Sequence, residues 1–130
     1  MEGGDKMLDK FAKPPVFLRK EAKDKYCSIA GVLFSEGKWK TGDEVALSAL
    51  VTNYQHWIDA EKLIKSNGDM CFTTESGYRQ QIPEISIANN AMKLMLTFIK
   101  EFGLTPKERA KLQEMLFSDS DDELENMVIK

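Results

Sequence analysis

The sequence predicts a mainly α-helical fold, in which a helical hairpin core of about four helices carries a short β-hairpin-like insert between the second and third. Long stretches repeat apolar residues every three or four positions, which is the spacing of one helix face. The repeat stops between residues 69 and 83, where β-prone residues flank the turn Glu75-Ser76-Gly77. Further along, the letters GLTP separate a third helix from a fourth.

The first helix is expected to begin at Phe17 and to run to about Glu36, behind a flexible basic arm of residues 1–16. The arm holds two glycines, three lysines and the Pro14-Pro15 pair, a composition that disfavours regular structure. Apolar residues then recur on one face of the helix, namely Phe17, Leu18, Ala22, Tyr26, Ile29 and Leu33.

The second helix is expected to be the longest, starting at a capping box and ending at Gly68. The capping box pairs Thr41 with Glu44, because each side chain can bond the backbone N–H of the other residue. One stripe of this helix is apolar and comprises Leu47, Leu50, Tyr54, Trp57 and Ile64.

The third helix, over residues 84–102, carries more apolar residues than one buried face requires. Its polar residues fit within about a third of the circumference. A four-helix chain of 130 residues cannot easily bury so broad an apolar surface by itself, so we expect a closed homo-oligomer. The residues predicted to form the oligomer interface are Met92, Met95, Phe98 and Ile99.

A sharp corner is expected between the third and fourth helices. Gly103 suits the left-handed conformation that commonly ends a helix. Thr105 and Glu108 can form a capping box, with Pro106 at the first helical position, where its missing N–H is not needed. The fourth helix is expected to be short and to end at about Leu116.

The net charge of −3 hides opposite charges at the two ends of the chain. Residues 1–40 hold nine Lys and Arg against six Asp and Glu, whereas residues 118–130 hold one against five. Clustered cations bind nucleic-acid phosphates without reading the base sequence. A solvated helix face is the alternative interpretation of this cluster. The residues predicted to bind DNA are Lys10, Lys13, Arg19, Lys20, Lys23 and Lys25.

Residues 118–130 form a predicted acidic tail after a helical domain of residues 17–117, which would oligomerise and engage DNA. The tail is too polar to fold alone, yet it places apolar anchors among its acidic residues. Such segments often become ordered on a partner, and a disordered solubility tail is the alternative. The residues predicted to bind a partner protein are Asp121, Asp122, Leu124 and Met127.

Catalytic and metal-binding patterns are sparse in the sequence. The chain has one histidine, His56, and no Walker loop, GxSxG, GxGxxG or HExxH motif. Cys27 and Cys71 stand 44 positions apart, which is not the spacing of a disulfide framework or a zinc site. We therefore expect no enzymatic activity, no cofactor and no metal site. The longest apolar stretch is too short for a membrane helix, and we expect an intracellular protein.

Three sequence segments stand in a recognisable order. They are "A…Y..IAGVL" in the first helix, "L..YQHWIDAEKLI" in the second, and "FGLTPKERAKL" at the corner. Over residues 17–114 this order resembles the phage terminase small subunit family, one branch of which ends its core with a GLTPxxRxxL signature. The positions that match this signature are Gly103, Leu104, Thr105, Pro106, Arg109 and Leu112.

The resemblance implies a DNA-packaging factor that is not itself an enzyme. Small subunits of this kind assemble into rings and bind double-stranded viral DNA in the cytoplasm of the bacterial host. They recruit or regulate the large terminase subunit, which carries the ATPase and the nuclease. By the same resemblance, the partner of the acidic tail would be the large subunit.

Two other classes of protein are alternatives. A phage or bacterial DNA-binding regulator without a packaging role would need a short turn between its second and third helices. Here an excursion of 15 residues separates them, which counts against that class. A small nuclease would need clustered acidic or histidine ligands, and a metal-dependent cleavage assay would detect it.

Overall fold

The computed structural model describes residues 13–129, and side chains for residues 13–118. Its elements in chain order are α2 (Lys20–Ser35), α3 (Asp43–Asn67), β1 (Cys71–Thr73), β2 (Arg79–Gln81), α4 (Pro83–Ile99), the 3-10 helix η1 (Lys100–Phe102) and α5 (Pro106–Ile129). The predicted fold class is confirmed, because four helices carry one antiparallel hairpin between the second and third.

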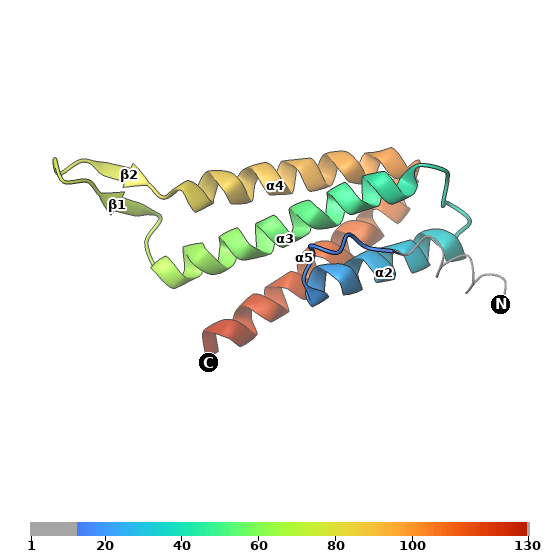
Figure 1. The fold of residues 1–130 in the computed structure, drawn as a ribbon, viewed down its shortest axis with the longest axis horizontal. Helices are drawn as coiled ribbons and strands as arrows, with labels where there is room; N and C mark the ends of the chain where they lie inside the picture. Colours follow the sequence, from blue (N-terminus) through green and yellow to red (C-terminus); the bar gives the residue numbers. More distant parts are fainter. Residues whose placement is uncertain (1–12, 130) are drawn as a thin grey trace.

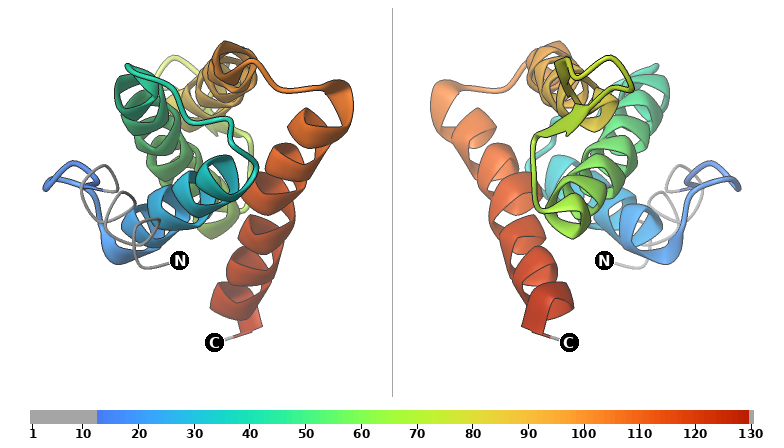
Figure 2. Two further views of the ribbon diagram at one scale, coloured as in Figure 1. Left: turned by 90° about the vertical axis from the view of Figure 1, so that its right-hand side faces the viewer. Right: turned by 90° about the vertical axis from the view of Figure 1, so that its left-hand side faces the viewer.

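Helices α3 and α4 run antiparallel along the long axis of the molecule, and the β1–β2 hairpin projects beyond one end of them (Figure 1). The two strands pair with Phe72 opposite Gln80. Seen along the long axis, α4 and α2 lie at opposite corners of the four-helix arrangement (Figure 2). The hairpin is therefore an appendage of the α3–α4 pair and not part of the core.

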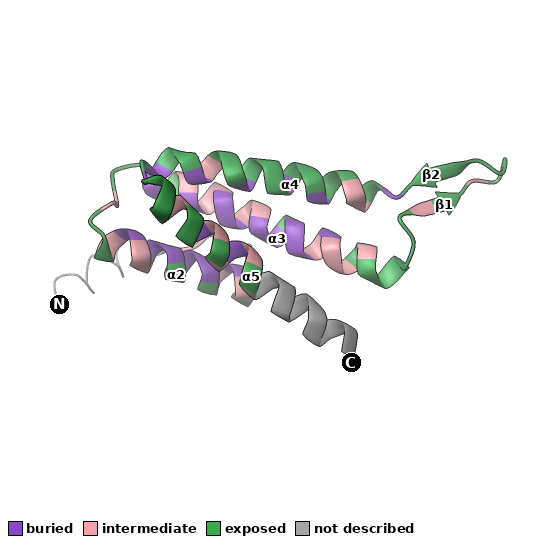
Figure 3. Cartoon of the chain, turned by 180° about the vertical axis from the view of Figure 1, so that it is seen from behind, coloured by how far each residue is buried: buried purple, intermediate pink, exposed green. Residues whose placement is uncertain are grey.

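Helix α3 is the centre of the fold because it contacts each of the other three helices. Its predicted apolar stripe is buried, with Leu47, Leu50 and Tyr54 almost fully inaccessible. Figure 3 shows buried residues along much of α2 and α3, while much of α4 is exposed. The other helices contribute fully or almost fully buried side chains, namely Tyr26, Ile29, Leu33, Met95, Ile99, Leu112 and Leu116.

The corner between α4 and α5 forms as the sequence predicts. Gly103 adopts the left-handed conformation, with a φ of 64°. The backbone N–H of Thr105 donates to Oε1 of Glu108 over 2.8 Å, and the N–H of Glu108 donates to Oγ1 of Thr105 over 3.2 Å. The first of these hydrogen bonds is the main reason that the pKa of Glu108 lies below its usual value.

The segment between α2 and α3 also holds this corner. Nζ of Lys40 donates to the carbonyl oxygen of Phe102 over 3.0 Å, just before Gly103. A Cβ at Gly103 would lie 2.8 Å from that Nζ, a contact that the flexible lysine side chain could relieve by shifting, so the left-handed φ of 64° is what favours glycine here. Lys111 in α5 also pairs with Glu36, just after the end of α2, at 3.3 Å.

The starts of the first two helices differ from expectation. The first begins at Lys20 and not at Phe17, because a turn closed by the N–H of Leu18 and the oxygen of Pro15 comes first. The predicted pairing of Thr41 with Glu44 is wrong, since α3 is preceded by Gly42 in the left-handed conformation. The carboxylate of Asp43 instead accepts a hydrogen bond from the backbone N–H of Lys40 over 2.9 Å.

The fourth helix is longer than predicted. It continues to Ile129, whereas the sequence pattern suggested an end at about Leu116. Residues 117–129 contain neither Gly nor Pro, so no local signal stops the helix after its last core residue. The acidic segment is therefore part of a helix that extends away from the α2–α3 core (Figure 1).

Candidate functional site

The exposed surface of α4 is the first candidate site, because this helix was predicted to form the oligomer interface. Met92 is 36% exposed and Phe98 is half-buried. Met95 and Ile99 are fully buried within the chain's own core, so their assignment to an interface with a neighbour is corrected. Both side chains lie on the side of α4 that packs against α3 and its neighbours.

Other apolar residues of α4 are exposed and were not assigned to the interface. Ile87 is 49% exposed, and Leu94 and Leu96 are each 37% exposed. Apolar residues thus extend past the buried stripe on both of its sides. The sequence showed how broad the apolar face of this helix is, but it did not show which of its residues pack against α3.

The start of α2 is the second candidate site, because it carries most of the predicted DNA-binding residues. Lys13 and Lys20 are exposed and Lys23 is half-buried. Lys20 forms an ion pair with Asp24 at 2.9 Å. Both side chains are well exposed, so water screens the pair and it contributes little to stability. Lys10 lies outside the described residues.

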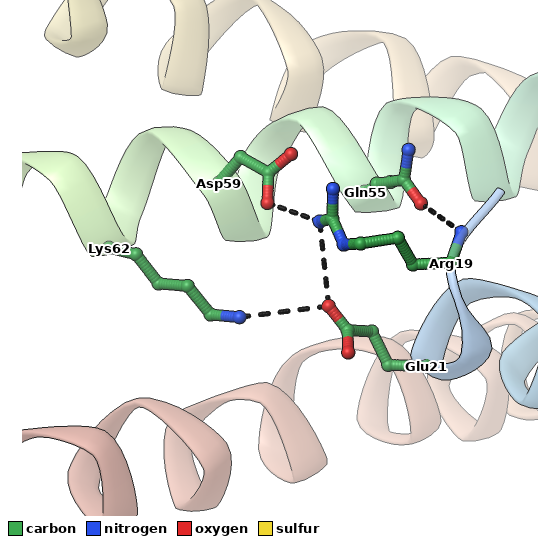
Figure 4. Close-up of polar contacts among 5 residues, drawn as sticks. All are labelled: Arg19, Glu21, Gln55, Asp59 and Lys62. Carbon is green, nitrogen blue, oxygen red and sulfur yellow. Dashed lines mark hydrogen bonds and ion pairs between the residues drawn. The ribbon is translucent and has the colours of Figure 1, made fainter. Parts of the chain in front are cut away.

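Arg19 takes part in an ion-pair network that connects the start of α2 with α3 (Figure 4). Its guanidinium donates to carboxylates of Asp59 and Glu21, and the hydrogen bond to Asp59 is the main reason that the pKa of Arg19 is raised. Lys62 also pairs with Glu21, at 3.6 Å. The backbone N–H of Arg19 donates to Oε1 of Gln55 over 2.7 Å.

This network fixes the point at which the basic arm meets the helical body. Arg19 remains about half exposed, but a phosphate would have to compete with Asp59 for its guanidinium. Arg19 is therefore a weaker DNA-binding candidate than Lys13 or Lys20. Its partner in α3 could not be recognised from the sequence, because 40 positions separate the two residues.

Lys25 does not belong to the exposed basic cluster, which corrects its assignment as a DNA-binding residue. Its side chain is only 8% exposed. Nζ donates to the backbone oxygen of Met115 in α5 over 2.5 Å and lies 5.5 Å from the ring centroid of Tyr54 in α3. Lys25 therefore joins three helices in the interior.

The residues predicted to bind the large subunit lie outside the part of the chain with described side chains. Asp121, Asp122, Leu124 and Met127 belong to the last turns of α5, whose backbone is helical. Their role stays a prediction.

No group of three or more His, Cys, Asp or Glu side chains among the described residues could hold a metal ion. Cys27 and Cys71 are free thiols, and burial raises the pKa of Cys27, which makes its thiolate scarcer. His56 is exposed in the middle of α3, as a solvent-facing helix residue. No helix among the described residues could cross a membrane.

Comparison with known families shows which family the chain belongs to. The family model of the phage terminase small subunit matches residues 22–116. The chain belongs to the phage terminase small subunit family. Membership implies a role in phage DNA packaging. No curated protein and no solved structure matched the chain.

The match to the terminase small subunit family covers α2 almost entirely, all of α3 and α4, and the first half of α5. It therefore includes the exposed surface of α4 and the corner at Gly103. It leaves out the basic arm, residues 17–21 and the acidic end of α5.

Proposed function

We propose that this terminase small subunit assembles into a ring, binds double-stranded DNA, and recruits or regulates the large subunit. The observation that carries the proposal is the family match over residues 22–116, which supplies the packaging role. The subunit acts without a catalytic reaction, cofactor or metal of its own. Its place of action is the cytoplasm of the bacterial host, where phage DNA is packaged.

The exposed apolar residues of α4 support the ring. Four large side chains are between 36% and 49% exposed on this one helix, which is an unusual density for a monomer surface. They replace Met95 and Ile99 in the proposed interface, while Phe98 lies half-buried beside them. The four residues are Ile87, Met92, Leu94 and Leu96.

Light scattering after size-exclusion chromatography is the direct test of assembly. We expect a mass of several subunits, because a hydrophobic interface of this kind is stable when it closes on itself. A single species at 14.8 kDa, measured at tens of micromolar protein, would contradict the ring. Addition of duplex DNA to the same column separates a stable oligomer from one that forms only on DNA.

The arm and the start of α2 support the DNA contact. Lys13 and Lys20 are exposed, and Lys10 precedes them in the sequence. Lys23 adds a half-buried cation one turn further along. A cluster of this kind binds phosphates without base specificity, and a ring would repeat it around its circumference and raise the affinity by avidity.

The acidic end of α5 supports recruitment of the large subunit. Deletion of residues 118–130 removes five acidic residues and leaves the core residue Leu116 in place. We expect the oligomer mass and the melting temperature to stay unchanged. Capture of the large subunit, measured in a pull-down at physiological salt, is expected to fall about tenfold or more, because a main docking segment is lost.

Charge replacement is the matched control for the deletion. Asp121→Asn with Asp122→Asn keeps the segment and its helix-forming residues but removes two charges. We expect an intermediate loss of capture that becomes smaller at high salt, since salt screens exposed charges. If the truncated protein captures the large subunit and stimulates its ATPase as well as the parent does, the contact lies on the helical body.

A further inference from the structure

The turn that precedes α2 exposes two neighbouring apolar side chains. Val16 is 91% exposed and Phe17 is 65% exposed, and neither belongs to the hydrophobic core. They occupy the two central positions of a β-turn, which is closed by the backbone N–H of Leu18 donating to the oxygen of Pro15 over 3.2 Å. This blue segment lies outside the four helices in both views of Figure 2. The turn therefore presents Val16 and Phe17 to whatever approaches the start of α2.

The turn is fastened to the helical body immediately after its exposed tip. Leu18 is only 3% exposed and belongs to the core. The backbone N–H of Arg19 donates to Oε1 of Gln55 in α3 over 2.7 Å. Before the tip, the prolines at positions 14 and 15 fix two backbone φ angles. Because the chain is already held in one conformation here, little entropy is lost when the tip contacts a partner.

Cations stand on both sides of the exposed tip. Lys13 lies two positions before the turn and Lys20 lies two positions after it, and both are exposed. The nearest carboxylates along the described chain, Glu21 and Asp24, are each paired with a cation. A second copy of the same turn would bring like charges together, which is unfavourable. An apolar tip between cations instead fits a polyanion that also offers an apolar surface.

We propose that Val16 and Phe17 form an apolar wedge that enters the minor groove of duplex DNA. Phe17 inserts between two base pairs and partly unstacks them, and Val16 packs beside it, while Lys13 and Lys20 contact phosphates on either side. Apolar wedges of this kind kink a duplex by roughly 20–90°. This inference rests on the proposed DNA binding and specifies a contact within it that is not electrostatic.

Affinity over a salt series distinguishes the wedge from the phosphate contacts. Val16→Ala with Phe17→Ala is expected to weaken binding to a short duplex about tenfold, because the inserted apolar surface is lost. The slope of log affinity against log salt is expected to stay that of the parent, since no phosphate contact is removed. Lys13→Ala with Lys20→Ala is expected to reduce the magnitude of the slope by about 2. Fluorescence anisotropy measures both variants.

The shape of the bound duplex gives a second measurement. Energy transfer between dyes on the two ends of the duplex is expected to rise when the parent protein bends it, and 2-aminopurine placed at the unstacked step is expected to brighten. Val16→Ala with Phe17→Ala is expected to give neither change, even at saturating protein. A duplex with central TA steps is expected to bind the parent more tightly than an A-tract, because TA steps unstack more easily.

Exposed apolar residues elsewhere in the chain provide the matched control. Val45 in α3 is 71% exposed and Tyr78 beside the hairpin is 67% exposed. Val45→Ala with Tyr78→Ala removes similar side chains and is expected to bind and bend DNA as the parent does. The melting temperature and the mass in light scattering of the Val16→Ala, Phe17→Ala protein are expected to equal those of the parent, because both side chains lie outside the core.

Four outcomes would overturn the wedge. If the Val16→Ala, Phe17→Ala protein binds and bends DNA as the parent does, DNA binding stands but the tip plays no part in it. A lower mass of that protein in light scattering would show that the tip contacts a second copy. Binding of the tip to phosphatidylserine vesicles, with no effect of the two substitutions on DNA affinity, would assign it to a membrane surface. A parent protein without affinity for any duplex would overturn the proposed DNA binding itself, and the wedge with it.

Discussion

Met95→Glu is expected to destabilise the fold of the chain and not simply to dissociate an assembly. Met95 is fully inaccessible and lies in the core that α4 forms with α3. An unpaired carboxylate at such a position costs several kcal/mol, out of a total stability of about 5–15 kcal/mol for a domain of this size. The melting temperature, followed by circular dichroism, is expected to fall by about 15 °C or more.

Met92→Glu is the matched control for this experiment, because it makes a similar change three residues earlier on the same helix. Met92 is 36% exposed, so its charge can reach water and the melting temperature of the monomer is expected to stay close to that of the parent. Loss of assembly without loss of folding is the expected result there. A folded, monomeric Met95→Glu protein would show that Met95 contacts a neighbour and not the chain's own core.

Charge reversal at Lys13, Lys20 and Lys23 is expected to weaken DNA binding by about 10²-fold at moderate salt. With Lys10, these residues are proposed to make about four phosphate contacts, for which counterion release predicts a slope of roughly −3 to −4 for log affinity against log salt. Three substitutions to Glu are expected to reduce the magnitude of this slope to about 1 or less. Fluorescence anisotropy with a duplex over a salt series measures both quantities.

Lys25→Met is the control that distinguishes the exposed cluster from the buried lysine. The substitution removes one positive charge from α2 but keeps the volume of a long side chain in the interior. DNA affinity and its salt slope are expected to remain those of the parent. Stability is expected to fall by about 1–3 kcal/mol, because the hydrogen bond from Lys25 to the carbonyl of Met115 and its contact with the ring of Tyr54 are lost. A loss of affinity without loss of stability would return Lys25 to the DNA-binding set.

Helix periodicity and capping chemistry were sufficient to predict most of the fold. The stripe of α3 and the corner at Gly103 could be recognised because the residues that form them are neighbours in the sequence. The reciprocal hydrogen bonds of Thr105 and Glu108 span three positions. The local prediction at Thr41 failed, because α3 begins at Asp43 after Gly42 in the left-handed conformation and no side chain caps its start. The carboxylate of Asp43 instead accepts a hydrogen bond from the backbone N–H of Lys40.

The candidate sites could be predicted only in part. A cluster of lysines and an unusually apolar helix are properties of composition, so the sequence indicated both surfaces. Which members of each set are exposed depends on the direction in which the helix packs. Lys20 and Lys25 are both lysines of the first helix and stand five positions apart. Lys20 is nevertheless exposed, whereas Lys25 is buried against Tyr54.

The sequence by itself determined the helices, the hairpin between α3 and α4, the corner and the difference in charge between the two ends. Each depends on residues within a few positions of one another, where backbone geometry limits the choices. Only the tertiary structure decided that Lys25 meets Met115, 90 positions away, and that Lys40 holds Phe102, 62 positions away. It also decided that Met95 is core while Leu94 and Leu96 are exposed, because the direction of α3 from α4 selects which of three adjacent side chains loses contact with water.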